Sequence, residues 1–308
     1  VGVLVVVLTM LVARGLTRSW SFGALAGLLL AIDGQAIVMS RTVLLDQTLA
    51  LFVLAGAGAM LLDRRVAAAR IVRWRHAHPS SWLGPALWSR PWLIAAGALL
   101  GAACAVKWSG LYFVAAFGLW TVALDALDRR RAGVRGWHVG TLLTQAPTSL
   151  VLVMVPALAV YLASWTGWFG GGYGSSWARD HPDELLTGAL AWVPERLQSL
   201  WHYHEQMWTF HVGLTNDHPF ESPAWQWLLL LRPTAFLLHL DGDLMTFITA
   251  LPNPIVWFPA VAGLAVLLYR MGARLDRTAA FLVVAVAAGY VPWLAFPDRT
   301  IFAFYTIV

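Results

Sequence analysis

VGTLLTQAPTSLVLVMVPALAVYLA, residues 139–163, contains no acidic or basic residue and exceeds the roughly 20 apolar residues that a helix needs to cross a bilayer. Similar apolar runs recur along the whole chain. We identify nine of them, at approximately 1–13, 20–39, 43–62, 92–106, 108–124, 139–163, 252–269, 278–296 and 300–308. The sequence therefore predicts an all-α polytopic membrane protein whose helices form a transmembrane bundle.

The composition supports this class and excludes others. Of the 308 residues, 59% are apolar and only 12% are charged, about half of the roughly 25% typical of soluble domains. This balance excludes a soluble globular enzyme, a disordered tail and a collagen-like rod. The single cysteine, Cys104, excludes an internal disulfide framework and a metal site built from several cysteines. The net charge of +5 is compatible with nucleic acid or acidic lipid. However, the arginines lie in short loops between apolar runs, so we expect membrane lipid and no nucleic acid as a partner.

The basic residues also predict the orientation of the chain. One set of alternate loops holds Arg14, Arg18, Arg64, Arg65, Arg70, Arg73, Arg75, Arg90, Arg129, Arg130, Arg131, Arg135, Arg270, Arg274 and Arg277. The other set holds fewer, namely Arg41, Lys107, Arg179, Arg196, Arg232 and Arg299. By the positive-inside rule the first set faces the cytoplasm. We therefore expect a multi-pass protein of the plasma membrane whose functional charges lie on the extracytoplasmic face.

The domain organisation follows from the spans. Residue 1 is not Met, residues 1–13 lack a charged leader and a cleavage site, and the chain ends inside an apolar run. We therefore interpret 1–308 as a fragment of one transmembrane domain. Segment 164–251 is expected to be an extracytoplasmic loop inserted between spans. Within it, residues 184–213 show the spacing of an amphipathic helix at the membrane surface, and Trp225 to Leu231 are expected to enter the interface as well.

Three charged residues lie near the outer ends of two predicted spans. Asp33 is in the outer half of the run 20–39, Arg41 precedes the run 43–62, and Asp46 lies one turn into it. Ionisable groups in hydrocarbon usually pair with each other or line a polar cavity. Two interpretations remain open, a local Arg41–Asp46 pair that fixes the hairpin of spans, or a cavity that binds a charged ligand.

Lys107 is the only lysine of the chain and lies in AVKWSG, between two apolar runs. One interpretation is a lysine that extends its stem to reach the membrane surface. An arginine would serve that role equally well, and this sequence uses arginine everywhere else. A compact, strongly hydrated ammonium suits a point contact with phosphate. We therefore interpret Lys107 as a phosphate ligand.

The long loop contains four histidines of interest, His202, His204, His211 and His218. On a helix the first two diverge by about 200°, and no carboxylate–histidine signature accompanies them, so no metal site is expected. HPFESPAWQWLLLLRP, His218 to Pro233, is either an acceptor-binding stretch or a membrane-surface anchor with Arg232 at the headgroups. The sequence also lacks phosphate-binding, dinucleotide-binding, zinc-protease and serine-hydrolase motifs. Asp241 and Asp243 are interpreted as a turn.

Five stretches together resemble the protein O-mannosyltransferases, most closely the bacterial members of actinobacterial type. They occur in family order as SRTVLLD (Ser40 to Asp46), AVKWSG (Ala105 to Gly110), ASWTGWF (Ala163 to Phe169), HPFESPAWQWLLLLRP and PWLAFPDRTIFAFY (Pro292 to Tyr305). The resemblance covers nearly the whole chain. It implies a GT-C glycosyltransferase fold, a transmembrane helix bundle with a large extracytoplasmic loop that carries interfacial helices.

The resemblance also implies an activity. Members transfer mannose, with inversion, from polyprenyl-phosphate-mannose to Ser or Thr of secreted or membrane proteins, including polypeptides in translocation, and need no cofactor. Their catalytic Asp-Glu pair is expected upstream of Val1, so no catalytic residue is assigned within 1–308. We assign the donor phosphate to Arg41, Lys107, Arg232 and Arg299, with Asp46 and Asp33 in support and Asp46 orienting Arg41. His218 and Trp225 are assigned to the acceptor side.

Three other functions remain open at this point. The first is another lipid-linked GT-C glycosyltransferase that acts on a cell-envelope glycan, and the second is a transporter or lipid flippase. The third is an inactive scaffold. Transporters favour charges at mid-membrane and helices broken by Gly or Pro. Here the charges of interest gather on one face beside a large Trp-rich loop, which favours a transferase at the membrane surface.

Overall fold

The computed structural model describes residues 1–42, 44–171 and 173–308. Val43, in the predicted run 43–62, and Gly172, in the predicted loop 164–251, lie outside the described residues. The elements are α1 (Gly2–Thr17), α2 (Trp20–Ala31), α3 (Gly34–Arg41), α4 (Asp46–Ala77), α5 (Pro91–Val106), α6 (Gly110–Arg131), α7 (Trp137–Gly140), the π-helix η1 (Thr141–Gln145), α8 (Ala146–Ser164), α9 (Thr166–Gly170), α10 (Tyr173–Asp180), the 3-10 helices η2 (Pro182–Glu184) and η3 (Gly188–Leu190), α11 (Glu195–Val212), α12 (Ala224–Trp227), β1 (Thr234–Asp241), β2 (Leu244–Ala250), α13 (Pro254–Arg274), α14 (Arg277–Tyr290) and the 3-10 helices η4 (Val291–Ala295) and η5 (Ala303–Ile307).

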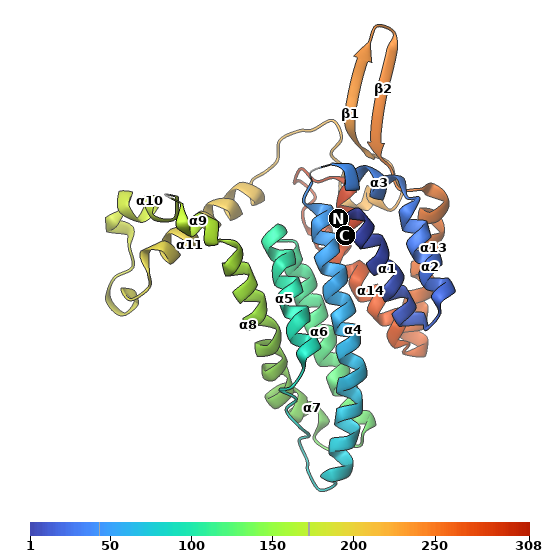
Figure 1. Cartoon of the computed structure of the whole chain (residues 1–308), viewed down its shortest axis with the longest axis vertical. Helices are drawn as coiled ribbons and strands as arrows, with labels where there is room; N and C mark the ends of the chain where they lie inside the picture. The colour runs from blue at the N-terminus through green and yellow to red at the C-terminus, as the bar shows by residue number, and fades with distance from the viewer. Residues whose placement is uncertain (43, 172) are drawn as a thin grey trace.

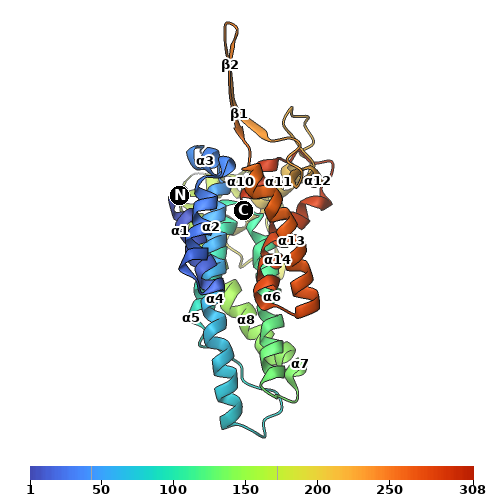
Figure 2. The ribbon, with the colours of Figure 1, turned by 90° about the vertical axis from the view of Figure 1, so that its right-hand side faces the viewer.

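The predicted all-α membrane protein is confirmed, with one small addition. Figure 1 shows an elongated helix bundle, and Figures 1 and 2 both show α3 and a hairpin of β1 and β2 at one end and α7 near the other. Among the described residues, four helical stretches are long and apolar enough to cross a membrane, 110–131, 137–164, 254–274 and 277–295. The bent pair α2 and α3 makes a fifth if it counts as one span. The shorter helices α1 and α5 are also apolar.

The predicted run 20–39 is not one straight helix. Helices α2 and α3 meet at an angle of 65°, because Asp33 caps the second of them. Its carboxylate accepts a hydrogen bond from the backbone N–H of Ala36 at 2.9 Å and another from Asn253 at 2.8 Å. Asp33 therefore pairs with backbone donors at the start of α3 and of α13.

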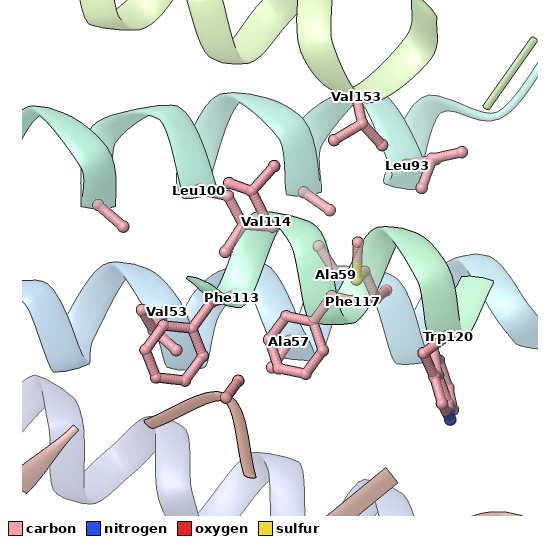
Figure 3. Packing of buried hydrophobic residues seen from close by; sticks show 14 of the residues in the cluster. Val53, Ala57, Ala59, Leu93, Leu100, Phe113, Val114, Phe117, Trp120 and Val153 are labelled. Carbon is pink, nitrogen blue, oxygen red and sulfur yellow. The ribbon is translucent and has the colours of Figure 1, made fainter. Parts of the chain in front are cut away.

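The main apolar core lies where α4, α5, α6, α8 and α14 meet, and Figure 3 shows part of it. Leu100 of α5 and Phe117 of α6 are fully buried. Phe117 stacks on Phe281 of α14 with ring centroids 5.8 Å apart, and Trp120 packs against the same ring at 5.1 Å. These contacts join the first half of the chain to α14.

Helices α5 and α8 approach closely at two glycines of α5. A Cβ atom on Gly97 would lie 2.4 Å from the carbonyl oxygen of Val153, and one on Gly101 would lie 2.4 Å from that of Ala157. The spacing of four residues places both glycines on one face of α5. This is the small-residue packing by which membrane helices bring their backbones together.

A buried ion-pair network joins α4, α6 and the residue before α5. Arg90, only 2% exposed, contacts Asp63 at 2.5 Å and Asp125 at 2.7 Å. Arg64 contacts Asp125 at 2.7 Å and reaches Asp128 at 3.8 Å. Charges in such surroundings persist because each one is compensated within the network.

Two further arginines extend this network. Arg277 of α14 pairs with Asp128 at 2.5 Å. Arg129, fully buried, donates to Gln145 Oε1 at 3.2 Å and to the carbonyl oxygen of Pro85. The sequence analysis counted Arg64, Arg90, Arg129 and Arg277 as loop charges. In the structure, acidic side chains neutralise Arg64, Arg90 and Arg277, whereas Arg129 donates to an amide and a carbonyl oxygen.

Three predicted element boundaries also need correction. Helix α4 continues past the predicted end at residue 62 to Ala77. The amphipathic helix predicted over 184–213 begins only at Glu195, because Pro194 disfavours helical backbone in the residue before it. The run 300–308 does not begin a spanning helix, since 303–307 forms a 3-10 helix packed against Trp227 and Trp293.

Within segment 164–251 the sequence analysis missed the β-hairpin. Strands β1 and β2 pair antiparallel, from Thr234 opposite Ala250 to Asp241 opposite Leu244. The DGD sequence forms the turn as predicted, with Gly242 at a φ of 58°. At the base of the hairpin, Ala250 is buried with Met39 of α3 and Phe304 of η5. The hairpin is thus anchored to the same end of the bundle as α3.

We predict that Gly101→Ala lowers the free energy of unfolding by about 1–3 kcal/mol, because the new methyl group overlaps the backbone of α8. Thermal unfolding of the purified protein in detergent measures the effect. Gly118→Ala on α6 is the control, since a Cβ there meets nothing within 4 Å, and alanine favours helix over glycine. Equal unfolding temperatures for the two variants would contradict the close packing of α5 and α8.

We predict that Asp125→Asn costs about 3–5 kcal/mol of stability, because it leaves buried Arg64 and Arg90 short of a negative charge. The same unfolding measurement tests this. Asp180→Asn removes an acid whose pair with Arg179 is largely exposed, and its expected cost is at most about 1 kcal/mol. A similar loss in both variants would show that the network does not depend on charge.

Candidate functional site

A lysine–aspartate pair lies at the end of the bundle that carries α3 and the hairpin. Lys107 is the C-cap residue of α5, and Asp46 is the first residue of α4. Lys107 Nζ donates to Asp46 Oδ1 at 2.8 Å. The Asp46 side chain is 6% exposed and that of Lys107 is 25% exposed. The turn that follows is tight, because a Cβ on Gly110 would lie 2.8 Å from the backbone nitrogen of Cys104.

Aromatic rings complete the surroundings of the lysine. The Nζ atom of Lys107 lies 3.7 Å from the ring centroid of Tyr305 and 6.0 Å from that of Trp293. The face of an aromatic ring attracts a cation, so the two rings help to hold the ammonium in place. Burial lowers the pKa of Lys107, although Asp46 opposes this shift. Burial also raises the pKa of Tyr305 to about 12, so its hydroxyl keeps its proton at neutral pH.

A second cation shares these rings. The guanidinium carbon of Arg299 lies 5.6 Å from the centroid of Trp293. Among the described residues no carboxylate lies within ion-pair distance of Arg299, and its buried Nε has no hydrogen-bond partner. Two cations, Lys107 and Arg299, therefore lie near one neutralising acid, Asp46. The site is left with an excess positive charge.

The loop within 164–251 holds the segment that carries Arg299. The backbone N–H of Thr300 donates to the carbonyl oxygen of Leu214 at 3.1 Å, and its hydroxyl donates to that of Asn216 at 2.6 Å. The backbone N–H of Ser222 donates to Ile301 at 2.9 Å. Buried Trp227 donates its indole N–H to Ser222 and packs against Trp293. The HPFESPAW and PWLAFPDRTIFAFY stretches thus form one structure.

An apolar groove of about 360 Å³ begins beside the cations. It lies between α13 and α14, and Tyr305 is one of its lining residues. Trp257, Leu264, Leu282 and Gly289 line it further along the two helices. The same tyrosine therefore borders both the ammonium of Lys107 and an apolar channel. An amphiphile with an anionic head and an apolar tail matches this arrangement.

The structure brings together some of the predicted phosphate ligands and separates others. Lys107, Arg299 and Asp46 lie in one cluster. The expected Arg41–Asp46 pair was wrong, because Asp46 is bonded to Lys107 from a different helix. Arg41 is exposed at the end of α3, five residues before Asp46 and at the same end of the bundle. Asp33 does not reach the cluster, since backbone donors occupy both of its carboxylate oxygens.

The remaining candidates lie in the outer loop. Arg232 is exposed and donates to the carbonyl oxygen of Glu221 at 3.4 Å. His218 accepts a hydrogen bond from the backbone N–H of Phe220 at 3.1 Å and packs edge-on against Phe302 at 5.0 Å. Trp225 is 55% exposed on α12. These three stay predictions as contacts to donor or acceptor.

The sequence analysis missed the aromatic part of the site. Tyr305 and Trp293 belong to a stretch quoted for its resemblance, yet only Arg299 in it was given a role. His211 of α11 was also left without one. Partial burial and the charges of Arg299 and Lys107 lower the pKa of His211. Among the described residues there is no group of three or more His, Cys, Asp or Glu that could hold a metal.

Comparison with known proteins agrees with these motifs. A family model described as dolichyl-phosphate-mannose-protein mannosyltransferase matches residues 1–166. A second, described as the C-terminal four TMM region of protein-O-mannosyltransferase, matches residues 196–305. No solved structure matches the chain.

Curated relatives named polyprenol-phosphate-mannose–protein mannosyltransferase match the whole length of the chain. One from Mycolicibacterium smegmatis is 36% identical over 100% of this chain and 62% of its own length. One from Mycobacterium tuberculosis is 37% identical over 99% and 60%, and one from Corynebacterium glutamicum is 34% identical over 99% and 61%. The chain thus spans about three fifths of the length of these relatives. The motifs, the fold and the matching family models together show that the chain belongs to the protein O-mannosyltransferase family.

Proposed function

We propose that this protein transfers mannose from polyprenyl-phosphate-mannose to Ser or Thr hydroxyls of secreted or membrane proteins, with inversion at the sugar carbon. The relatives are named for the polyprenol-phosphate-mannose donor and for a protein acceptor. The observation that carries the proposal is the cluster of Lys107, Arg299 and Asp46 at one end of a membrane helix bundle.

The charge of the cluster fits the proposed donor. A sugar–phosphate–lipid diester carries one negative charge, and the cluster has two cations against one acid. When the bond between the sugar and the phosphate breaks, the departing lipid phosphate gains negative charge. Cations already in position stabilise that charge in the transition state, and one such contact is typically worth about 3–4 kcal/mol. Lys107 and Arg299 would supply this stabilisation, with Asp46 and Tyr305 holding Lys107.

The groove between α13 and α14 fits the rest of the donor. Its apolar lining suits a polyprenyl chain, and its start at Tyr305 keeps such a chain next to the phosphate ligands. The donor would then lie with its tail along the helices and its mannose above the bundle end. Arg41, at the same end, would approach the phosphate or the sugar from the side of α3.

The acceptor would come from the side of the outer loop. His218 and Trp225 lie in the segment that holds Arg299 in place, so an acceptor bound there would meet the mannose. We place this end of the bundle on the extracytoplasmic face of the plasma membrane, since the less basic set of loops gathers there. Polypeptides in translocation would present their Ser and Thr residues on that face.

We predict that Lys107→Gln lowers mannose transfer about a hundredfold or more, because one preformed cation at the phosphate is lost. Full-length protein in membranes, polyprenyl-phosphate-mannose and a Ser/Thr-containing peptide form the assay, with mass spectrometry of the peptide as readout. Arg299→Gln and Arg41→Ala should also lower transfer. Arg196→Gln is the control, since this exposed arginine donates to the carbonyl oxygen of Phe169 and forms no ion pair with any described residue.

Loss of the lysine also leaves Asp46 buried without its partner and can lower stability. A separate control for folding is therefore needed. The double variant Lys107→Gln, Asp46→Asn removes both charges and should restore stability without restoring transfer. Near-normal transfer by stably expressed Lys107→Gln protein would remove this residue from the site. Transfer to a cell-envelope glycan, with none to peptide, would favour a different lipid-linked GT-C glycosyltransferase.

A further inference from the structure

A chain of hydrogen bonds runs from the residue after Lys107 to the outer helix α11. The indole N–H of Trp108 lies 3.0 Å from the hydroxyl oxygen of Tyr161 on α8. That hydroxyl lies 2.5 Å from Nε2 of His204 on α11. Nδ1 of His204 in turn lies 2.7 Å from the carbonyl oxygen of Leu200. All of these side chains are partly buried.

The chemistry of the groups fixes the direction of each bond. A carbonyl oxygen can only accept, so Nδ1 of His204 carries a proton, and in the neutral imidazole Nε2 is then an acceptor. The hydroxyl of Tyr161 therefore donates to Nε2 of His204. An indole N–H can only donate, so Tyr161 accepts from Trp108. Loss of the Tyr161 hydroxyl would remove both of these bonds, the one from Trp108 and the one to His204.

Helix α11 has few other attachments to the bundle. Its backbone packs mainly against α10, and Figure 1 shows α9, α10 and α11 projecting sideways from the end of α8. Trp201 is 76% exposed and Trp208 is 59% exposed. His204 connects α11 to the bundle, since it stacks on Trp108 with ring centroids 5.4 Å apart and packs against Trp165 at 5.1 Å.

Where α11 meets the bundle it covers an apolar groove of about 350 Å³. Cys104 and Trp108 line the groove from the α5–α6 side, Tyr161 lines it from α8, and His204 and Trp208 line it from α11. Cys104 is only 7% exposed and lies three residues before Lys107. Displacement of α11 would open this groove and release Trp108, the neighbour of the lysine.

We propose that Tyr161 and His204 are positioning residues, which hold α11 against the turn between α5 and α6 and so fix Lys107 for the donor phosphate. The second half of this statement rests on the function proposed above, whereas the attachment of α11 does not. Because Trp108 is the residue next to Lys107, a fixed indole restricts the backbone of the turn and the direction of the ammonium.

Tyr161→Phe tests the proposal with the smallest change, since it removes only the hydroxyl. The first readout is the rate at which a water-soluble maleimide modifies Cys104 in the protein in lipid vesicles, located by mass spectrometry of the peptide. We expect the rate to rise about tenfold, the effect of one lost hydrogen bond on the opening of α11. The second readout is mannose transfer by the full-length enzyme, where kcat should fall while KM for the acceptor peptide stays the same.

His204→Phe breaks the same bond from the other partner and keeps a ring against Trp108. The two single variants and the double variant should label Cys104 at the same rate, because the second substitution has no bond left to remove. Tyr203→Phe is the matched control, since Tyr203 is 41% exposed and contacts Trp165 and Trp168 through its ring. It should leave both readouts unchanged.

Each outcome is decisive for a different statement. Unchanged labelling of Cys104 in Tyr161→Phe overturns the attachment of α11, whatever the transfer rate. Faster labelling with a normal kcat overturns the role of the attachment in positioning Lys107. Absence of transfer in the unsubstituted enzyme would refute the proposed function, and the labelling rates would still test the attachment. A rate for the double variant equal to the product of the single effects would show that Tyr161 and His204 act separately.

Discussion

A charged side chain in the apolar interior of a membrane protein must be compensated by the protein itself, and this constraint organises both ends of the bundle. At one end, Asp63, Asp125 and Asp128 neutralise arginines from three different segments. At the other end, Asp46 compensates Lys107, while no carboxylate among the described residues lies within ion-pair distance of Arg299, which packs on Trp293. The first cluster pairs each of its three acids with arginines and holds helices together. The second keeps unused positive charge, which makes it suitable for an anionic ligand.

The close packing of α5 contributes directly to the second cluster. Gly97 and Gly101 allow this helix to approach α8 at backbone distance, and α5 ends at Lys107. The position of the ammonium is therefore fixed by residues two and three turns away that have no side chains. The core residues Leu100 and Phe117, both fully buried, secure the other faces of the same region. The packing of helices in the bundle therefore also determines the geometry of the site.

The sequence predicted the helices well, because apolar runs of about 20 residues are typical of helices that cross a bilayer. It also placed Lys107, Asp46 and Arg299 at the same end. Successive loops were assigned to opposite sides of the membrane in turn, and this assignment put the three residues on one side. The sequence analysis failed where the partners of an ion pair are far apart in the sequence. Asp46 was assigned to Arg41, five residues away, whereas its partner is 61 residues away. Arg64 and Arg90 resembled loop residues because Asp125, which neutralises both, comes from α6. The roles of Tyr305 and Trp293 depend on how the last described segment folds back, which periodicity does not encode. The single-domain assignment, the orientation and the individual ligand roles stay predictions.

The β-hairpin has a consequence for handling the protein outside a bilayer. Its two strands form the entire sheet, so each has one edge with unpaired backbone groups. Leu238, Leu240, Leu244 and Met245 beside those edges are all more than half exposed. Free strand edges with apolar side chains are templates for pairing between separate molecules. Concentrated preparations will therefore be prone to self-association through this projection, and their colloidal behaviour will depend on what shields it.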